Sequence, residues 1–481
     1  MTLSRVLTLS LLAVAACGNP AEVIDTPEPP IVNPPVTAKK ATINVVHASP
    51  DAPAVDVYLN GKVAVPGLSF RKGTGNVVLD AGDYKVELRP AGAAATTAAV
   101  YSVDLSLAKD SRTLVVAQGR LGDAAGSSTA FRLTPLPFGT KDAGAVQLRL
   151  IHSAPSAPMV DLAVGASNII NDVKFGEASS FAKLQSDVAA GTELGVRPGD
   201  AAVDLAFVVT PNATLPKGTI LSAIAFGEIV PLIADDRFLS VSAVNEDSGQ
   251  LVDLTVRIND KGPKASFYVL HASPDAPGVD VVTKTGDKLV SDLRFRNVSS
   301  KLQVPGGVYP VEVRVAGQPT VVLSTNVKLL PALSWGLVAT GLAGGGAADR
   351  KLVLAALSSP PKGASGTKLR VVHTSPDAPA VDIASGNTTL VSNLKYLQAT
   401  SFLDFASGIP AGTLKVRAAG QPKDLYDIVI DNTIGPATLG QNVSVFATGQ
   451  VSATPPTFQA IAVVESADRP TVVALPTTPS K

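Results

Sequence analysis

The chain has 481 residues, which is too long for one typical domain and predicts several. Its 40 Lys and Arg residues balance 40 Asp and Glu residues, so no charge excess favours nucleic acid or acidic lipid, and no nucleic-acid partner is expected. An apolar share of 46% comes with 40 Gly and 37 Pro, a mixture that favours short strands and turns over long helices.

The first 16 residues predict a signal peptide. Arg5 precedes an apolar run over residues 6–16, which is too short for a membrane-spanning helix but fits the core of an export signal. The tetrapeptide VAAC, which ends at Cys17, resembles the bacterial lipobox. That resemblance implies cleavage before Cys17 and lipidation of its sulfur. An ordinary signal peptide followed by an incidental cysteine is the alternative.

The residues after the predicted cleavage site point to the cell envelope. Cys17 is the only cysteine, so no disulfide, thiolate metal site or cysteine nucleophile is expected in the mature chain. Gly18 follows it, and the resemblance to sorted lipoproteins favours the outer membrane over the inner one. Residues 17–40 are Pro-rich without a hydrophobic period and predict a linker. We expect a lipid-anchored protein that faces the periplasm or the surface.

One motif recurs four times along the rest of the chain. It reads INVVHASPDAPAVDVYL from Ile43 and returns as LRLIHSAPSAPMVDLAV, FYVLHASPDAPGVDVVT and LRVVHTSPDAPAVDIAS. In each copy two prolines follow the His, and an Asp stands nine residues after it. The pairs are His47 and Asp56, His152 and Asp161, His271 and Asp280, and His373 and Asp382. Intervals of roughly 100 to 120 residues are domain-sized and exceed those of solenoid repeats.

Two further patterns accompany each motif and complete the repeat. One is a Gly-centred turn before a strand that ends in Arg, and the other is an apolar strand that closes with Ala-x-Gly. Each copy is long enough to bury its own core, so we expect four domains with short Pro/Gly-rich junctions. The predicted boundaries are 41–141, 142–259, 260–363 and 364–475, followed by a tail at 476–481.

The first copy predicts seven short strands and no helix. Gly, Pro, Asp and Asn separate apolar or alternating runs at 42–47, 55–59, 76–80, 84–89, 99–107, 112–118 and 129–134. This pattern predicts an all-β chain of four tandem immunoglobulin-like β-sandwich domains. Small antiparallel β-barrels give the same pattern and remain the alternative.

Strand alternation predicts where the motif side chains point. Counting back by twos from His47 gives Val45 and Ile43, so the His shares the apolar face and is expected to point inward. The intervening positions include Asn44, Arg149, Tyr268 and Arg370. A buried neutral imidazole needs a hydrogen-bond partner, and the Asp nine residues on is the predicted one. The Asp between the prolines, which is Ser156 in copy two, is expected in a local Asx-turn.

We therefore interpret the eight motif residues as structural. In the competing interpretation His and Asp ligate a metal or perform acid–base chemistry. Metal sites use three or more protein ligands, whereas the motif supplies at most two strong ones. No repeating third group completes a nucleophilic triad. No catalytic residue, metal ligand or cofactor is assigned, and the sequence predicts that the protein is not an enzyme.

The HASPDAPxVD motif, the Gly-turn strand and the Ala-x-Gly strand together resemble the bacterial family catalogued as domain of unknown function 4397. The resemblance covers nearly all of residues 41–470 in four copies. It implies an exported, β-rich domain that is often found in tandem, and it carries no assigned activity or site residues. Copy two departs most, because SAPSAP replaces ASPDAP.

The resulting hypothesis is a non-enzymatic envelope protein whose tandem domains act in adhesion, scaffolding or envelope interaction, where linked weak sites gain avidity. Its partners would be the membrane, through the lipid, and an envelope protein or a glycan. Glycan binding is the alternative function, weakened because Trp335 is the only Trp available for stacking. A metal-dependent hydrolase is a third candidate. The oligomeric state is not predicted.

Overall fold

The structure is a computed structural model that describes residues 39–480 with ten gaps. The gaps are 95, 124–125, 200–202, 229–236, 346, 348–349, 360–365, 432–439, 455–456 and 466–468. The predicted signal peptide, Cys17 and almost all of the predicted linker lie outside the described residues. Within the described part, no helix is long and apolar enough to cross a membrane.

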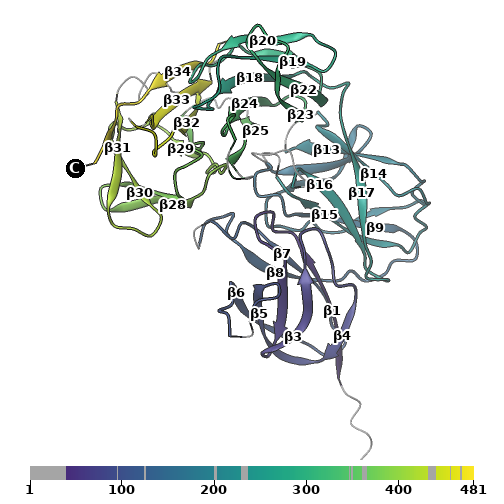
Figure 1. Ribbon diagram of the computed structural model, residues 1–481. Helices are drawn as coiled ribbons and strands as arrows, with labels where there is room; N and C mark the ends of the chain where they lie inside the picture. Colours follow the sequence, from purple (N-terminus) through teal and green to yellow (C-terminus); the bar gives the residue numbers. More distant parts are fainter. Residues whose placement is uncertain are drawn as a thin grey trace, which may run out of the picture. The chain divides into compact units, whose positions relative to one another are not determined.

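Two four-stranded sheets form the first repeat (Figure 1). Its strands are β1 (Lys40–His47), β2 (Val55–Leu59), β3 (Lys62–Leu68), β4 (Val77–Asp80), β5 (Gly82–Pro90), β6 (Tyr101–Leu107), β7 (Arg112–Gln118) and β8 (Arg132–Pro137). The sheet orders are β4-β1-β7-β8 and β3-β2-β5-β6, and β1 runs parallel to β7. Strand β3 was not predicted, because Pro66 and Gly67 interrupt the alternation of its residues.

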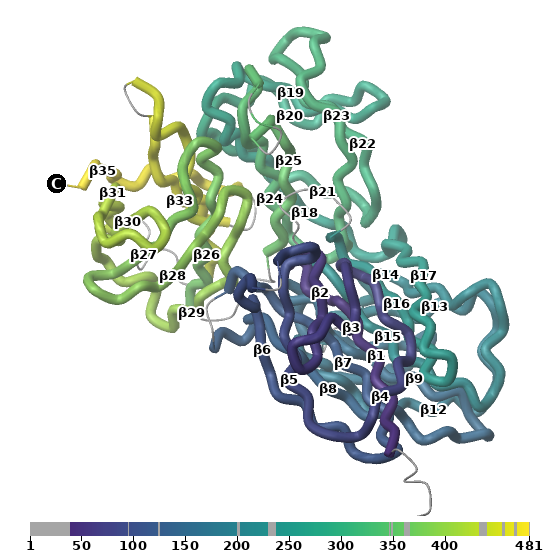
Figure 2. Tube along the Cα trace, turned by 60° about the horizontal axis from the view of Figure 1, so that its bottom comes forward, coloured from purple at the N-terminus to yellow at the C-terminus, as the bar shows by residue number. Residues whose placement is uncertain are grey.

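The third repeat has the same two sheets, and the fourth extends each by one strand. The third contains β18 (Ala265–His271), β19 (Val279–Thr283), β20 (Lys288–Leu293), β21 (Leu302–Val304), β22 (Gly307–Val315), β23 (Val321–Leu329), β24 (Ser334–Thr340) and β25 (Val353–Ser359). The fourth contains β26 (Thr367–His373), β27 (Val381–Ser385), β28 (Thr388–Leu394), β29 (Leu403–Phe405), β30 (Gly412–Ala418), β31 (Asp424–Ile430), β32 (Asn442–Thr448), β33 (Gln459–Glu465), β34 (Thr471–Ala474) and β35 (Thr477–Pro479). Figure 2 shows β35 beside β31, so residues assigned to a tail form an edge strand.

The second repeat joins its two sheets into one. It contains β9 (Val146–His152), β10 (Val160–Val164), β11 (Ser167–Val173), β12 (Ala182–Leu184), β13 (Glu193–Pro198), β14 (Ala206–Val209), β15 (Ile220–Phe226), β16 (Ser240–Asn245) and β17 (Leu251–Ile258). Strand β17 pairs with both β14 and β16 and makes a continuous nine-stranded sheet. The prediction of an all-β chain of tandem β-sandwiches is confirmed. In the second repeat the two sheets of the sandwich are joined along one edge by β17.

Each repeat has an apolar core between its sheets. In the first repeat Val45, Val57, Leu88 and Val115 meet in this core. The fourth repeat has the equivalent set, and the third is built around Trp335. Residues of the second repeat, among them Leu205, Ala206 and Phe238, also join the core of the third. Inward positions alternate along the strands as the sequence predicts.

The outer faces of the motif-bearing sheets are buried as well, because repeats pack in pairs. Residues of the first repeat, including Val46 and Val116, pack against Ile151, Ile224 and Phe226 of the second. In the same way Leu270 and Val338 of the third repeat pack against the fourth, including residues Val372, Phe446 and Ile461. Strand β9 is buried at all seven positions. Sheet-on-sheet contact thus links the first repeat to the second and the third to the fourth.

Candidate functional site

The four motif histidines end β1, β9, β18 and β26 and are at most 1% exposed. Their burial agrees with the alternation. In each, Nε2 lies 2.8–3.1 Å from the carbonyl oxygen of the second motif proline. Those prolines are Pro53, Pro158, Pro277 and Pro379. A carbonyl only accepts, so Nε2 carries the proton and donates it. The prediction that the Asp is the partner is wrong, because the Pro-x-x-Pro turn brings its own main chain to the ring.

Each imidazole sits in an apolar enclosure. An aromatic ring stands edge-on to it, with centroids 6.1–6.3 Å apart: Phe70, Phe175, Phe295 and Tyr396. A small residue pairs with the His in parallel register on the neighbouring strand, namely Ala117, Ala225, Ala339 and Ala447. Burial lowers the pKa of all four histidines, partly opposed by the proline carbonyl. The rings are therefore neutral at pH 7.

The motif aspartates hold main-chain amides. Asp56 accepts from Gly67 N through Oδ1 at 2.7 Å and from Gly92 N through Oδ2 at 3.0 Å. The other three motif aspartates accept the equivalent bond through Oδ1 at 2.7–2.8 Å. The pairs are Asp161 with the amide of Asp172, Asp280 with the amide of Asp292, and Asp382 with the amide of Asn393. The four residues whose amides donate to these Oδ1 atoms have φ angles between 42° and 62°. Each motif Asp thus fixes a left-handed residue where the strand register shifts.

The Asp between the prolines reaches across to another loop. Asp51 accepts from Leu121 N at 2.7 Å and Gly122 N at 2.9 Å, just after the Ala-x-Gly strand. Asp275 and Asp377 bind the corresponding amides of their own repeats. The expected local Asx-turn is therefore wrong as the main role of this side chain. In the second repeat Ser156 replaces the Asp.

The glycine of the Ala-x-Gly strand is required by its surroundings. The φ angles of the four glycines lie between 84° and 102°, in the left-handed region. A Cβ atom would also collide with a main-chain oxygen of the returning chain. The glycines are Gly119, Gly227, Gly341 and Gly449.

A buried ion-pair network, not predicted from the sequence, lies at the sheet face where the second repeat packs against the first. Arg149 donates through Nε to Ser222 Oγ at 2.7 Å and through Nη2 to Glu246 Oε1 at 2.9 Å. Its Nη1 reaches the carbonyl of Pro137 in the first repeat at 2.8 Å. Phe181 covers the guanidinium at 4.8 Å. An arginine three residues before the His, and a Glu that ends an apolar strand, are the signals that could have identified this network.

The fourth repeat has the same network. Arg370 donates to Ser444 Oγ at 2.8 Å and to the carbonyl of Ser358 in the third repeat at 2.6 Å. Its Nη2 lies 3.7 Å from Glu465 Oε1. Tyr268 of the third repeat donates to that carboxylate at 3.2 Å. The pairing of the third repeat with the fourth thus repeats that of the first with the second.

The motif offers little for catalysis or surface stacking. In all four copies the motif His and the Asp nine residues after it bind different main-chain groups, so the two side chains do not form a dyad. Among the described residues no group of three His, Cys, Asp or Glu could hold a metal ion. Trp335 is fully buried and donates to the Leu330 carbonyl at 3.2 Å, so it provides no surface for a sugar ring.

Comparisons with known proteins identify related sequence over most of the chain. A family described as "Domain of unknown function (DUF4397)" matches residues 41–163, 265–384 and 367–474. No curated protein matches. The chain is similar to the Bacillus anthracis TIE protein at 10% identity and a TM-score of 0.14, covering 79% of this chain and 63% of that one. The major pilin subunit BcpA of Bacillus cereus gives 10% identity and a TM-score of 0.12, with 62% and 98% covered. This chain therefore spans less than two thirds of the length of the first of these proteins.

Proposed function

This chain belongs to the DUF4397 family, and from that premise we propose that it is a non-enzymatic cell-envelope protein with a scaffolding or adhesive role. One observation carries the proposal: the fold itself uses the polar groups of the repeated motif. The histidines donate to proline carbonyls, and the aspartates hold amides of bulges and loops. A motif repeated four times for this purpose maintains a framework rather than a reaction centre.

The pairing of repeats supports a scaffold in particular. Flexibly linked domains would tolerate independent movement, whereas each pair here has a shared apolar contact and a buried ion-pair network. The bidentate contact of Arg120 with Glu228, at 2.8 Å for both bonds, adds a further link between the first two repeats. Stiff pairs hold their exposed loops at fixed separations, which favours multivalent contact with an envelope partner.

The proposed attachment is a lipid on Cys17. The apolar run and the VAAC tetrapeptide support export and acylation, and residues 17–40 supply a Pro-rich spacer. Placement in the outer membrane, facing the periplasm or the cell surface, completes the proposal and rests on Gly18 after the cysteine.

Crosslinking in living cells tests this function. We expect the wild-type chain to crosslink reproducibly to an envelope protein or glycan, and the Cys17→Ser variant to lose that product while keeping its fold. An exposed-residue control, Lys423→Ala, should crosslink like the wild type. A chain that crosslinks to nothing in the envelope, yet hydrolyses a substrate in a manner that depends on His373, would overturn the proposal.

A further inference from the structure

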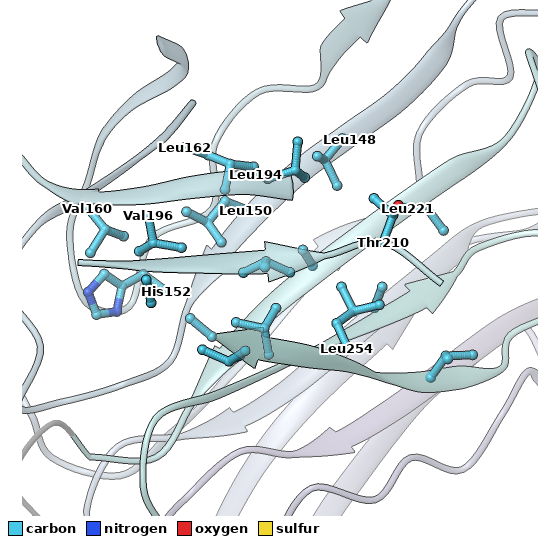
Figure 3. A pocket seen from close by; sticks show the side chains of 18 of the residues that line it. Leu148, Leu150, His152, Val160, Leu162, Leu194, Val196, Thr210, Leu221 and Leu254 are labelled. Atoms are coloured by element: carbon cyan, nitrogen blue, oxygen red, sulfur yellow. The ribbon is translucent and has the colours of Figure 1, made fainter. Parts of the chain in front are cut away.

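The second repeat encloses an apolar cavity between its sheet faces. Its volume is about 140 Å³, against about 70 Å³ for the cavity in the first repeat. Figure 3 shows His152 and Val160 at one end of the cavity and Thr210 and Leu221 at the other. The cavity therefore extends along β9, whose inward positions from Val146 to His152 span about 20 Å.

One core position of the second repeat has a smaller side chain than the equivalent positions of the other repeats. In the parallel pairing of β15 with β9, Leu221 and Ala223 stand opposite Leu148 and Leu150. The third repeat has larger residues at the same register positions, Trp335 and Leu337. The residue equivalent to Ala223 is Val115 in the first repeat and Val445 in the fourth. The alanine at this position thus distinguishes the core of the second repeat from the cores of the other three, and the cavity of the second repeat is the larger of the two.

The walls of the cavity are almost entirely apolar. Strand β17 contributes Leu254 and Val256 to the lining. It pairs with both β14 and β16 and so joins the two sheets along one edge of the cavity. The polar lining residues are His152, Thr210 and Asn245, and Asn245 Oδ1 accepts from the amides of Asp247 and Ser248 at 3.1 Å. His152 Nε2 donates to the Pro158 carbonyl at 2.8 Å, and Thr210 Oγ1 to the Ala189 carbonyl at 3.1 Å. The lining is almost entirely aliphatic, so a charged ligand would lose its hydration with little replacement.

We propose that this cavity binds an uncharged hydrocarbon group, either a small apolar molecule or the alkyl chain of a lipid. Dry cavities of about 150 Å³ lined by aliphatic side chains accept ligands such as benzene or xenon. Leu184, Pro211 and Leu215, at the end away from His152, are partly exposed and provide the entrance. A polar headgroup stays outside this entrance. This activity goes beyond the proposed scaffolding role.

Methyl NMR of the unlipidated chain, with Cys17 replaced by Ser, tests the proposal with n-hexane as probe. Saturable shifts are expected at the methyl groups of Ala223 and Ala225, with none at Ala339 or Ala447 of the other repeats. Hexane should also raise the melting temperature by a few degrees, because it binds only the folded chain. Dodecanoic acid is the second probe. If dodecanoic acid displaces hexane, the cavity binds acyl chains. If hexane binds and dodecanoic acid does not displace it, the cavity binds small apolar molecules.

Two variants make the test specific. Ala223→Val installs the residue of the first and fourth repeats and should abolish the shifts at Ala225 while the fold persists. Leu337→Ala removes bulk from the third repeat and should create hexane-dependent shifts at Ala339. The proposal is overturned if hexane shifts no methyl of the second repeat, or if the shifts at Ala225 survive in a folded Ala223→Val chain.

Discussion

Arg149 donates to Glu246 across 2.9 Å where both side chains are at most 5% exposed, at the face that the first repeat covers. Arg370 and Glu465 stand in the same relationship under the third repeat, 3.7 Å apart. Removing two charges from water is costly, and only their mutual attraction and the hydrogen bonds of nearby serines and carbonyls offset that cost. The two ion pairs therefore depend on the contact between repeats, and that contact depends on them.

Breaking one partner of this ion pair should destabilise the first pair of repeats strongly. Arg149→Met leaves the Glu246 carboxylate buried without its counter-charge, and we expect a loss of about 3–5 kcal/mol. The double variant Arg149→Met with Glu246→Leu should lose much less, because no isolated charge remains. Urea unfolding of the three chains measures this. Equal losses of unfolding free energy in the single and double variants would contradict the role given to the Arg149–Glu246 ion pair.

Loss of a motif histidine should be felt in the partner repeat as well. His373→Ala removes a buried, hydrogen-bonded ring and should cost about 1–3 kcal/mol. Because Val372 and Phe446 pack on the third repeat, hydrogen exchange should accelerate in both the third and the fourth repeats and remain unchanged in the first. The exposed variant Lys423→Ala is the control. Exchange that changes in the fourth repeat alone would show that the repeats unfold separately.

Stability should fall as the solution is acidified below about pH 6.5, the usual pKa of an unfolded histidine. Burial lowers the pKa of the four histidines in the folded chain. Below pH 6.5 the unfolded chain therefore binds more protons, and the stabilisation is lost as the pH falls through the folded pKa. Unfolding free energies between pH 7.5 and pH 5 should show this slope. In His373→Gln the slope should be shallower, and an unchanged slope would exclude this histidine as a contributor.

Replacing a motif Asp should weaken the bulge that it holds. Asp382 accepts from the amides of Asn393 at 2.7 Å and Gly420 at 2.9 Å. We expect Asp382→Ala to cost about 1–3 kcal/mol, since both amides lose their acceptor. Asp404→Ala, which removes an exposed carboxylate paired with Lys368, should cost less than about 1 kcal/mol. Denaturant titrations of both variants provide the comparison, and similar losses would show that the bulge needs no acceptor.

Cys17 should determine where the protein is found. With an acylated cysteine the chain should remain in the membrane fraction, and Cys17→Ser should release it into the soluble fraction, because a hydrophobic anchor is lost. Fractionation of cells that express the two chains distinguishes them. A variant that stays with the membranes would show that the attachment lies elsewhere.

The sequence predicts what depends on neighbouring residues and misses what depends on distant ones. The inward position of His47 follows from alternation over a few residues, and so does the all-β class. The partner of that ring is a main-chain carbonyl, Pro53 O, which leaves no signature in residue types. The burial of Arg149 requires knowing that another repeat covers its sheet face. Strand alternation within one repeat contains no such information.

The pairing restricts how many repeats a chain of this kind can have. Arginine precedes the motif histidine by three residues only in the second and fourth copies. In these copies a glutamate also follows or ends the strand next to β15 or β32: Glu246 comes directly after β16, and Glu465 ends β33. The first and third copies have Asn44 and Tyr268 at the position of the arginine instead. A chain of three such repeats would leave one sheet face, with its valines and leucines, open to water. Deleting one repeat is therefore expected to expose an apolar sheet face that its partner now covers.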